Sequence, residues 1–167
     1  MTTRSFRIFG PKGVHERGIA FEPEPNTPRV HARTVADRVP VCDIMSCEVV
    51  CATPELEIAG VVELVLREKI GCVPIVDDRG QPIGMITKLD LVEHLVARDP
   101  ASRVTAGEIM MPLAITLDHN ATVAHAASLM ASEDMHHVMI VRDRQLLGVV
   151  STMDIARWLA DNDELLS

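Results

Sequence analysis

The chain has 167 residues, which is enough for one domain of ordinary size or for two small domains that share a core. Aromatic residues make up only 2% of it, too few for a surface that stacks single-stranded nucleic acid. The 24 acidic residues outnumber the 16 basic ones, so we expect no duplex nucleic acid partner. No targeting signal and no apolar run of membrane-spanning length is present, so we expect a cytoplasmic protein without membrane insertion.

Residues 1–38 differ in character from the rest, with seven basic and four acidic residues. Three prolines interrupt regular structure in this segment: Pro23, Pro25 and Pro28. We expect an N-terminal arm that is extended or partly disordered. Its apolar residues Phe6, Ile8 and Phe9 form either a short strand or a contact with a partner, and the sequence does not choose between these. Residues 163–167 are expected to be a tail.

From Val39 onward the sequence repeats itself. The matches keep one register apart from a single deletion, and three of them are Ile44-Met45 with Ile109-Met110, Gly84 with Gly148 and Asp90 with Asp154. They predict two related units, at residues 39–100 and 101–162.

Each unit is predicted to run strand–helix–strand–strand–helix. Apolar residues at helical spacing predict the buried face of the first helix: Ile58, Val61, Val62, Val65 and Leu66. We expect Thr53 to cap this helix, with Pro54 at its first position. The runs 73–76 and 82–86 flank a polar turn and predict a hairpin. The second helix is expected to place four residues on one face: Leu91, Val92, Leu95 and Val96.

Three motifs follow one another in the first unit: Val73-Pro74-Ile75-Val76-Asp77, Gly84-Met85-Ile86 and Thr87-Lys88-Leu89-Asp90. The second unit departs from this pattern, with Met139 at the position of the proline, Arg142 at that of the first aspartate, and Ser151-Thr152-Met153-Asp154. The doubled pattern resembles a tandem pair of cystathionine β-synthase (CBS) domains, over about residues 39–162. The resemblance implies an α/β (α+β) fold in which two pseudo-twofold-related β-α-β-β-α repeats pack through their sheets.

The resemblance also implies a class of function. CBS pairs bind adenosine nucleotides such as AMP, ADP or ATP in clefts between the repeats, some bind S-adenosylmethionine, and they regulate an enzyme, channel or transporter. We therefore expect a sensor that is not an enzyme, needs no cofactor and signals to an unidentified partner. Two alternatives stay open: a structural interaction or dimerisation module with degenerate clefts, and a redox- or metal-responsive sensor. The spacing of the four cysteines matches no zinc signature, so we expect no metal.

The doubled S/T-x-x-D motif supplies the first candidate nucleotide-binding residues. By family resemblance, Thr87 and Ser151 face phosphate, and Asp90 and Asp154 face ribose. The chemistry is suitable, because the start of a helix offers N–H groups to phosphate and a carboxylate accepts hydrogen bonds from ribose hydroxyls. The alternative interpretation is a capping box, in which hydroxyl and carboxylate only satisfy the start of the helix.

Four further residues are candidates for phosphate contact. His136 and His137 stand where some CBS proteins carry a His-Arg pair, and imidazole can donate a hydrogen bond to phosphate. Lys88 and Arg157 lie near the starts of their helices. The alternatives are a half-exposed strand start for the histidines and a solvated helix face for the cations. The first unit carries Gly71-Cys72 where the second carries His136-His137, so the two sites should differ.

Apolar residues that do not cover the sheet predict a homodimer, since large exposed apolar patches mark contacts. We assign four residues to this patch: Leu56, Leu64, Leu129 and Trp158. CBS pairs commonly associate through such helices, which the resemblance also implies. The arm is expected to lie across the partner, with Phe6 and Phe9 docked on it.

Overall fold

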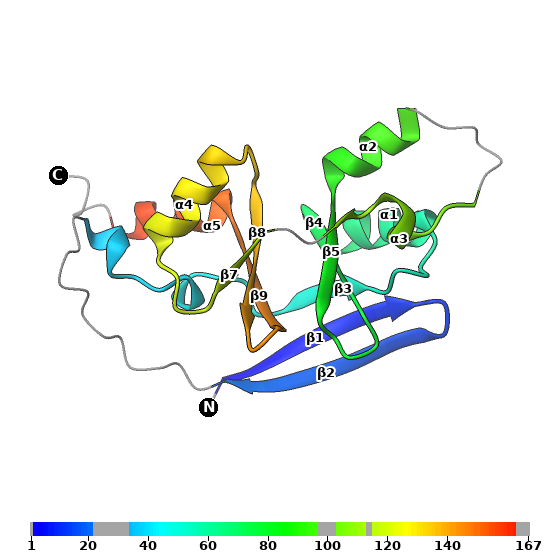
Figure 1. The fold of residues 1–167 in the computed structure, drawn as a ribbon, viewed down its shortest axis with the longest axis horizontal. Coiled ribbons are helices and arrows are strands. Elements are labelled where there is room, and N and C mark those ends of the chain that lie inside the picture. The colour runs from blue at the N-terminus through cyan, green and yellow to red at the C-terminus, as the bar shows by residue number, and fades with distance from the viewer. Residues whose placement is uncertain (1, 22–33, 97–102, 113–114, 163–167) are drawn as a thin grey trace. The chain divides into compact units, whose positions relative to one another are not determined.

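The computed structural model describes residues 2–21, 34–96, 103–112 and 115–162 (Figure 1). The chain divides into two compact units. The first-repeat unit comprises Arg4–Ile19 and Glu48–Ala114, and the second-repeat unit comprises Met1–Thr3, Ala20–Cys47 and Ile115–Ser167. Each unit is built on its own sheet, so the predicted mixed α/β fold with two sheets is confirmed.

The first-repeat unit is built on a six-stranded sheet in the order β2-β1-β3-β4-β5-β6. Its strands are β1 (Thr2–Gly10), β2 (Gly13–Phe21), β3 (Val49–Ala52), β4 (Cys72–Val76), β5 (Pro82–Thr87) and β6 (Met111–Pro112). Its helices are α1 (Ile58–Glu68), α2 (Lys88–Val96) and α3 (Ala106–Ile109). β3 runs parallel to β1 and β4, whereas β5 runs antiparallel to β4 and β6. The elements β3, α1, β4, β5 and α2 follow the order predicted for a repeat.

The core of this unit lies between α1 and the central strands of the sheet. Four residues of α1 are buried: Ile58, Val61, Leu64 and Val65. They belong to one cluster with residues of β3, β4 and β5: Val50, Ala52, Val73, Ile75 and Ile86. Burial of such a side chain contributes about 1.5–3 kcal/mol. Every residue of β3 and β4 is buried, which explains why these strands read as uninterrupted apolar runs.

The start of α1 differs from the prediction. The helix begins at Ile58 with Glu57 as its N-cap residue, so Thr53 does not cap it and Pro54 is not its first residue. Thr53 instead opens a turn, in which its carbonyl accepts a hydrogen bond from the Leu56 amide at 3.1 Å. The Thr-Pro pair marks this turn, because such residues favour turns as strongly as helix starts.

The predicted helix faces are also partly wrong. Leu66 is 71% exposed, because the apolar stripe of α1 is wider than the surface that the sheet covers. Leu64, which was assigned to the dimer patch, is buried in the core, and Leu56 packs against that core. In α2 only Leu91 is buried, and the rest of its predicted buried face is exposed: Val92, Leu95 and Val96.

The second-repeat unit is built on a three-stranded sheet in the order β7-β8-β9. Its strands are β7 (Thr116–Asp118), β8 (His137–Arg142) and β9 (Gln145–Ser151), its helices are α4 (Val123–Ser132) and α5 (Thr152–Asp161), and two short 3₁₀ helices precede them, η1 (Val35–Asp37) and η2 (Val41–Asp43). Thr122 caps α4, since its hydroxyl accepts a hydrogen bond from the His125 amide at 3.2 Å. Leu129 and Trp158 are half-buried and not exposed as the dimer prediction required.

The segment that leads into each repeat packs with the other repeat. The Val41 amide donates to the Ala121 carbonyl at 2.8 Å within the second-repeat unit. Its counterpart, the Ala106 amide, donates to the Leu56 carbonyl at 2.8 Å within the first-repeat unit. The sequence boundary at residue 39 therefore does not coincide with the boundary of a compact unit.

Two glycines at equivalent positions, Gly84 and Gly148, leave room for these leading segments. A Cβ atom on Gly148 would lie 2.6 Å from Met45 Sδ and 2.7 Å from the Ser46 carbonyl oxygen. Ser46 and Val149 also exchange two backbone hydrogen bonds, of 2.9 and 3.2 Å, so the backbone has little freedom to retreat. In the first repeat, a Cβ on Gly84 would lie 2.5 Å from Met110 Sδ. The same glycine–methionine contact thus occurs once in each repeat.

Gly148→Ala should therefore destabilise the protein by about 1–3 kcal/mol, because the added methyl group overpacks the contact with Met45 and Ser46. Urea unfolding followed by circular dichroism measures the change. Gly60→Ala is the matched control: its Cβ would meet the side chain of Leu56, and alanine favours the interior of α1 by up to about 1 kcal/mol. Equal stability of Gly148→Ala and the wild type would contradict this packing role.

The N-terminal arm contributes two strands to the first-repeat unit. β1 pairs in parallel with β3, with Phe6 opposite Val49 and Phe9 opposite Ala52 (Figure 1). Of the two interpretations of the arm, the structure therefore shows the strand. Phe9 packs against the core of its own unit, so its predicted docking on another subunit is wrong. Residues 22–33 of the arm and the tail at 163–167 lie outside the described residues.

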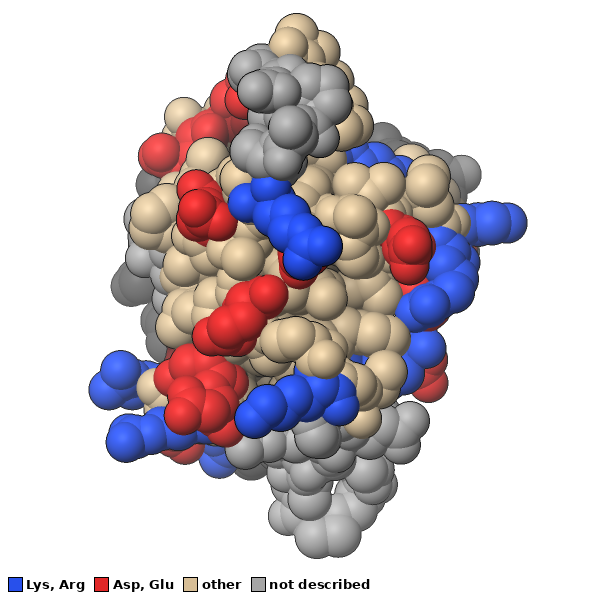
Figure 2. Space-filling model, turned by 90° about the vertical axis from the view of Figure 1, so that its right-hand side faces the viewer, with Lys and Arg blue, Asp and Glu red and all other residues tan. Residues whose placement is uncertain are grey.

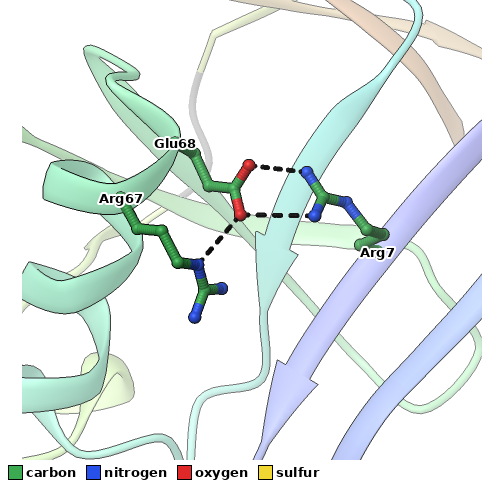
Figure 3. Close-up of polar contacts among 3 residues, drawn as sticks. All are labelled: Arg7, Arg67 and Glu68. Atoms are coloured by element: carbon green, nitrogen blue, oxygen red, sulfur yellow. Dashed lines mark hydrogen bonds and ion pairs between the residues drawn. The ribbon is translucent and has the colours of Figure 1, made fainter.

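A charged cluster attaches β1 to α1 (Figure 3). The guanidinium group of Arg7 donates to both carboxylate oxygens of Glu68, at 2.7 and 3.2 Å. Arg67 donates its Nε hydrogen to the same carboxylate at 3.1 Å, and its guanidinium group lies 5.2 Å from the centre of the Phe9 ring. The hydrogen bonds from Arg7 and then Arg67 lower the pKa of Glu68. β1 is thus held by side-chain charges as well as by backbone pairing.

Glu68→Gln should loosen β1, because a neutral amide cannot pair with two guanidinium groups. At pH 7, hydrogen–deuterium exchange should be faster for β1 amides than in the wild type. The difference should exist above the ordinary value of 4.5 and fade as the pH falls through the lowered pKa of Glu68, where the wild-type carboxylate becomes neutral too. Glu63→Gln, on an exposed position of α1, is the control. Unchanged exchange in Glu68→Gln at pH 7 would refute the attachment.

Candidate functional site

The first candidate site residues meet where β5 becomes α2, which we call the first junction. The Thr87 amide and hydroxyl both donate to Asp90 Oδ2, at 2.6 and 2.7 Å. The Asp90 amide donates back to Thr87 Oγ1 at 3.3 Å. This is the capping box that the sequence offered as an alternative interpretation. Lys88 is exposed beside it, and its amide donates to the Gly71 carbonyl at 3.1 Å.

The second junction, where β9 becomes α5, repeats this geometry. The Ser151 amide and hydroxyl donate to Asp154 Oδ2 at 2.8 and 2.6 Å, and the Asp154 amide donates to Ser151 Oγ at 3.2 Å. The Thr152 amide donates to the His136 carbonyl at 3.0 Å, as Lys88 does to Gly71. Arg157 reaches Asp154 Oδ1 at 3.5 Å. The duplicated sequence has therefore kept one local structure at both places.

Each capping box uses only one oxygen of its aspartate. Within the described part of the chain, Asp90 Oδ1 accepts no hydrogen bond, and Asp154 Oδ1 has only the long contact to the exposed Arg157. The capping box and a ribose contact are therefore compatible, since each needs a different carboxylate oxygen. The hydroxyl groups of Thr87 and Ser151 already donate their hydrogens to the aspartates. The predicted contact of these hydroxyls with phosphate is therefore less well supported than the ribose contact of the aspartates.

The histidines distinguish the second junction from the first. His136 is exposed directly before β8, and His137, the first residue of β8, is half-buried and pairs with Ser151 across the hairpin. The first junction has Cys72 paired with Thr87 in the same register. The structure thus brings both histidines to the second junction, together with Ser151 and Asp154. Thr87, Lys88 and Asp90 form the first junction.

The alternative of a redox sensor finds little support in the two buried thiols, whereas Cys42 and Cys47 are half-buried. Cys51 and Cys72 are buried, and burial raises the pKa of the Cys51 thiol to about 12, with the nearby Cys72 adding to the shift. A thiol with so high a pKa carries almost no thiolate at neutral pH and reacts slowly. Among the described residues no group of three or more His, Cys, Asp and Glu side chains is placed to hold a metal ion.

The surface of the described residues also bears on the choice of partner. On the face drawn in Figure 2, acidic and basic side chains are interspersed with uncharged surface, and several basic side chains lie next to one another along its right edge. No helix in the described ranges is both long and apolar enough to cross a membrane.

Sequence reasoning overlooked a cavity of about 270 Å³ in the second-repeat unit. It lies between α4, α5 and the start of β8, and eight residues line it: Ala127, Met130, Ala131, Asp134, Met135, His136, Thr152 and Ile155. A comparison of the two repeats contains a signal for it. Ala127 and Ala131 stand where the first repeat has the larger Val62 and Leu66.

Comparison with known proteins adds family and fold. The sequence profile of the CBS domain matches residues 41–97 and 106–161. The chain is 31% identical over 136 residues to the uncharacterized protein MJ1404 of Methanocaldococcus jannaschii, a match that covers 72% of this chain but only 32% of that protein. It is 28% identical over 121 residues to hypoxic response protein 1 of Mycobacterium tuberculosis, covering 72% of this chain and 85% of that one.

A solved structure is similar over most of its own length. The CBS domain pair of protein MJ0100, in complex with 5′-methylthioadenosine and S-adenosyl-L-methionine, superposes with a TM-score of 0.67 at 29% identity. The match covers 74% of this chain and 97% of that one. About three quarters of this chain thus superposes on nearly the whole length of a CBS domain pair.

Proposed function

The chain belongs to the CBS-domain family as a tandem pair, and from this we propose that it is a regulatory module that binds an adenosine ligand. The observation that carries the proposal is the duplicated junction, in which a capped aspartate keeps one carboxylate oxygen for a ligand. The ligand class is that of AMP, ADP or ATP, with S-adenosylmethionine as an alternative. The similar MJ0100 pair, which holds two adenosine compounds, supports this class.

Each ligand part has a chemical counterpart among the junction residues. Asp90 and Asp154 would accept hydrogen bonds from ribose hydroxyls through Oδ1. Phosphate would be bound by Lys88 at the first junction and by His136, His137 and Arg157 at the second. Arg157 would exchange its contact with Asp154, long at 3.5 Å, for the phosphate. The two junctions would therefore bind the same nucleoside with different affinity for its phosphate.

The module would act on another protein and not on its ligand. The carboxylates and hydroxyls at both junctions serve the helix starts, and no nucleophile with an adjacent base is formed among these residues. We therefore propose that the protein is not an enzyme and that an enzyme or transporter is regulated by its ligand-bound state. A structural module that binds no ligand is the competing function, and ligand titration separates the two.

An adenosine nucleotide should raise the melting temperature, since a ligand at a hundredfold excess over its Kd stabilises the folded state by about 2.7 kcal/mol. Asp90→Ala and Asp154→Ala should each weaken binding at their own junction about ten- to hundredfold, because a hydrogen bond to a charged group is lost. Isothermal titration with AMP, ADP, ATP and S-adenosylmethionine measures affinity, and thermal melts without ligand measure stability.

Glu108→Ala is the matched control for these variants. Glu108 closes the same kind of capping box with Thr105 at the start of α3, a helix that belongs to neither junction, so its loss should lower stability without changing affinity. Aspartate variants that behave like Glu108→Ala would reduce Asp90 and Asp154 to caps. A melting temperature unmoved by millimolar concentrations of all four compounds would reject the adenosine proposal itself.

We also propose a homodimer, through a helix surface that differs from the predicted patch. α2 exposes four large apolar side chains, and α1 adds a fifth: Leu89, Val92, Leu95, Val96 and Leu66. α1 and α2 are in contact within the first-repeat unit, so these residues belong to neighbouring helices. An apolar surface of this kind is stable in water only when another surface covers it, and a second copy supplies a matching one.

Light scattering should therefore give about twice the chain mass of 18.3 kDa at micromolar concentration. The double variant Val92→Glu/Leu95→Glu should be monomeric, because both side chains are exposed and the new charges would be buried only on association. Met153→Glu, at an exposed apolar position on α5, is the control. A wild-type protein that stays monomeric at high concentration would disprove the dimer.

A further inference from the structure

The cavity of the second-repeat unit is lined mainly by apolar groups and carries a few polar groups at its edge. Met130 is buried, and Ala127, Met135 and Ile155 are half-buried. Asp134, His136 and Thr152 are more exposed. This division between an apolar floor and a polar edge is typical of sites for small molecules.

The first repeat is an internal reference for this cavity, because its junction has the same backbone structure. Val62 and Leu66 occupy the positions of Ala127 and Ala131. The second repeat therefore has smaller side chains at these two positions.

The charges at the cavity are reversed relative to the first repeat. Asp134 has a left-handed backbone with φ of 51°, and its counterpart Lys69 has φ of 54°, so the two residues occupy the same conformation. Thr152 likewise stands where the first repeat has Lys88. The first repeat thus carries two ammonium groups at positions where the second has a carboxylate and a hydroxyl.

The end of α4 adds to this negative field. The cavity lies against the last turns of α4, which ends at Ser132, and the C-terminal end of a helix carries a partial negative charge. In the first repeat Lys69 lies at the C-cap of α1, where a cation is favourable. In the second repeat Glu133 and Asp134 follow the helix, and no Lys or Arg lines the cavity.

The cavity also lies apart from the proposed ribose contact. Thr152 and Ile155 line it from one side of α5. Asp154 lies about 160° around the helix axis from Thr152 and about 100° from Ile155, at 3.6 residues per turn. A molecule in the cavity therefore does not need the Asp154 carboxylate, although it shares His136 with the proposed phosphate contacts.

We propose that this cavity binds a small organic cation with an apolar body, such as a primary amine. The apolar part packs against Ala127, Met130 and Met135, which line the cavity. The ammonium group replaces the charge of Lys69 and lies between the Asp134 carboxylate and the end of α4. Methionine sulfur is polarisable and packs well against an apolar or aromatic body.

Benzylamine is a suitable test compound, with benzyl alcohol and benzoate as its neutral and anionic analogues. Titration of full-length protein carrying ¹³C-methyl methionine should shift the signals of Met130 and Met135. We expect benzylamine to bind about tenfold more tightly than benzyl alcohol, and benzoate not to bind, since an ion pair adds to the same apolar contact.

Two variants transfer the residues of the first repeat into the second. Ala127→Val/Ala131→Leu should abolish the shifts by filling the cavity. Asp134→Lys should weaken benzylamine about tenfold and leave benzyl alcohol unchanged, since Lys69 shows that lysine accepts this backbone conformation. Ala156→Leu and Asp161→Lys make the same changes at exposed positions of α5 outside the cavity, and both should bind as the wild type does.

Equal binding of benzylamine and benzyl alcohol would overturn the proposal, as would shifts that survive in Ala127→Val/Ala131→Leu. Light scattering of that double variant tests the other occupant, a second copy of this chain. A change from dimer to monomer without any effect on benzylamine would assign the cavity to a subunit contact and reject the ligand site.

Discussion

A single repeat of this size cannot cover its sheet by itself. The segment that precedes each repeat packs closely against a glycine in the other repeat, and the rest of the structure depends on this contact. Met45 and Ser46 lie against Gly148, where no side chain fits. Met110 and Met111 lie against Gly84 in the same way. The strands that these glycines belong to end at the two junctions, so the position of each candidate aspartate is fixed by a segment from the other half of the sequence.

The sequence was sufficient for the repeat, the element order and the family, because these depend on periodicity and on motifs that occur twice. It failed where burial depends on which neighbour is present. Leu64 and Leu66 are equally apolar and lie on the same helix, yet only the first meets the sheet. The arm shows the same limit, since pairing of β1 with β3 is a long-range contact that local propensity does not encode.

The candidate sites were predictable as positions but not as chemistry. The S/T-x-x-D spacing indicated both a capping box and a ligand contact, and the structure shows how one carboxylate can serve both, through separate oxygens. The cavity was not predicted, because alanine and methionine are common core residues and do not by themselves indicate a binding site. The cavity is indicated only by differences between equivalent positions of the two repeats, such as Asp134 and Lys69. These differences can be interpreted only once the structure shows that both residues have the same backbone conformation.

The exchange of leading segments has a consequence for how the two halves could have arisen and how they can be separated. A cut between residues 100 and 101 would place in each fragment a segment that packs on the other fragment. β5 would lose its pairing with β6, and β9 would lose the bridge between Val149 and Ser46. Neither fragment would be an autonomous domain, although together they would contain every contact. Such fragments should fold only when they are mixed. The pair of repeats, and not the single repeat, is therefore the smallest unit that folds.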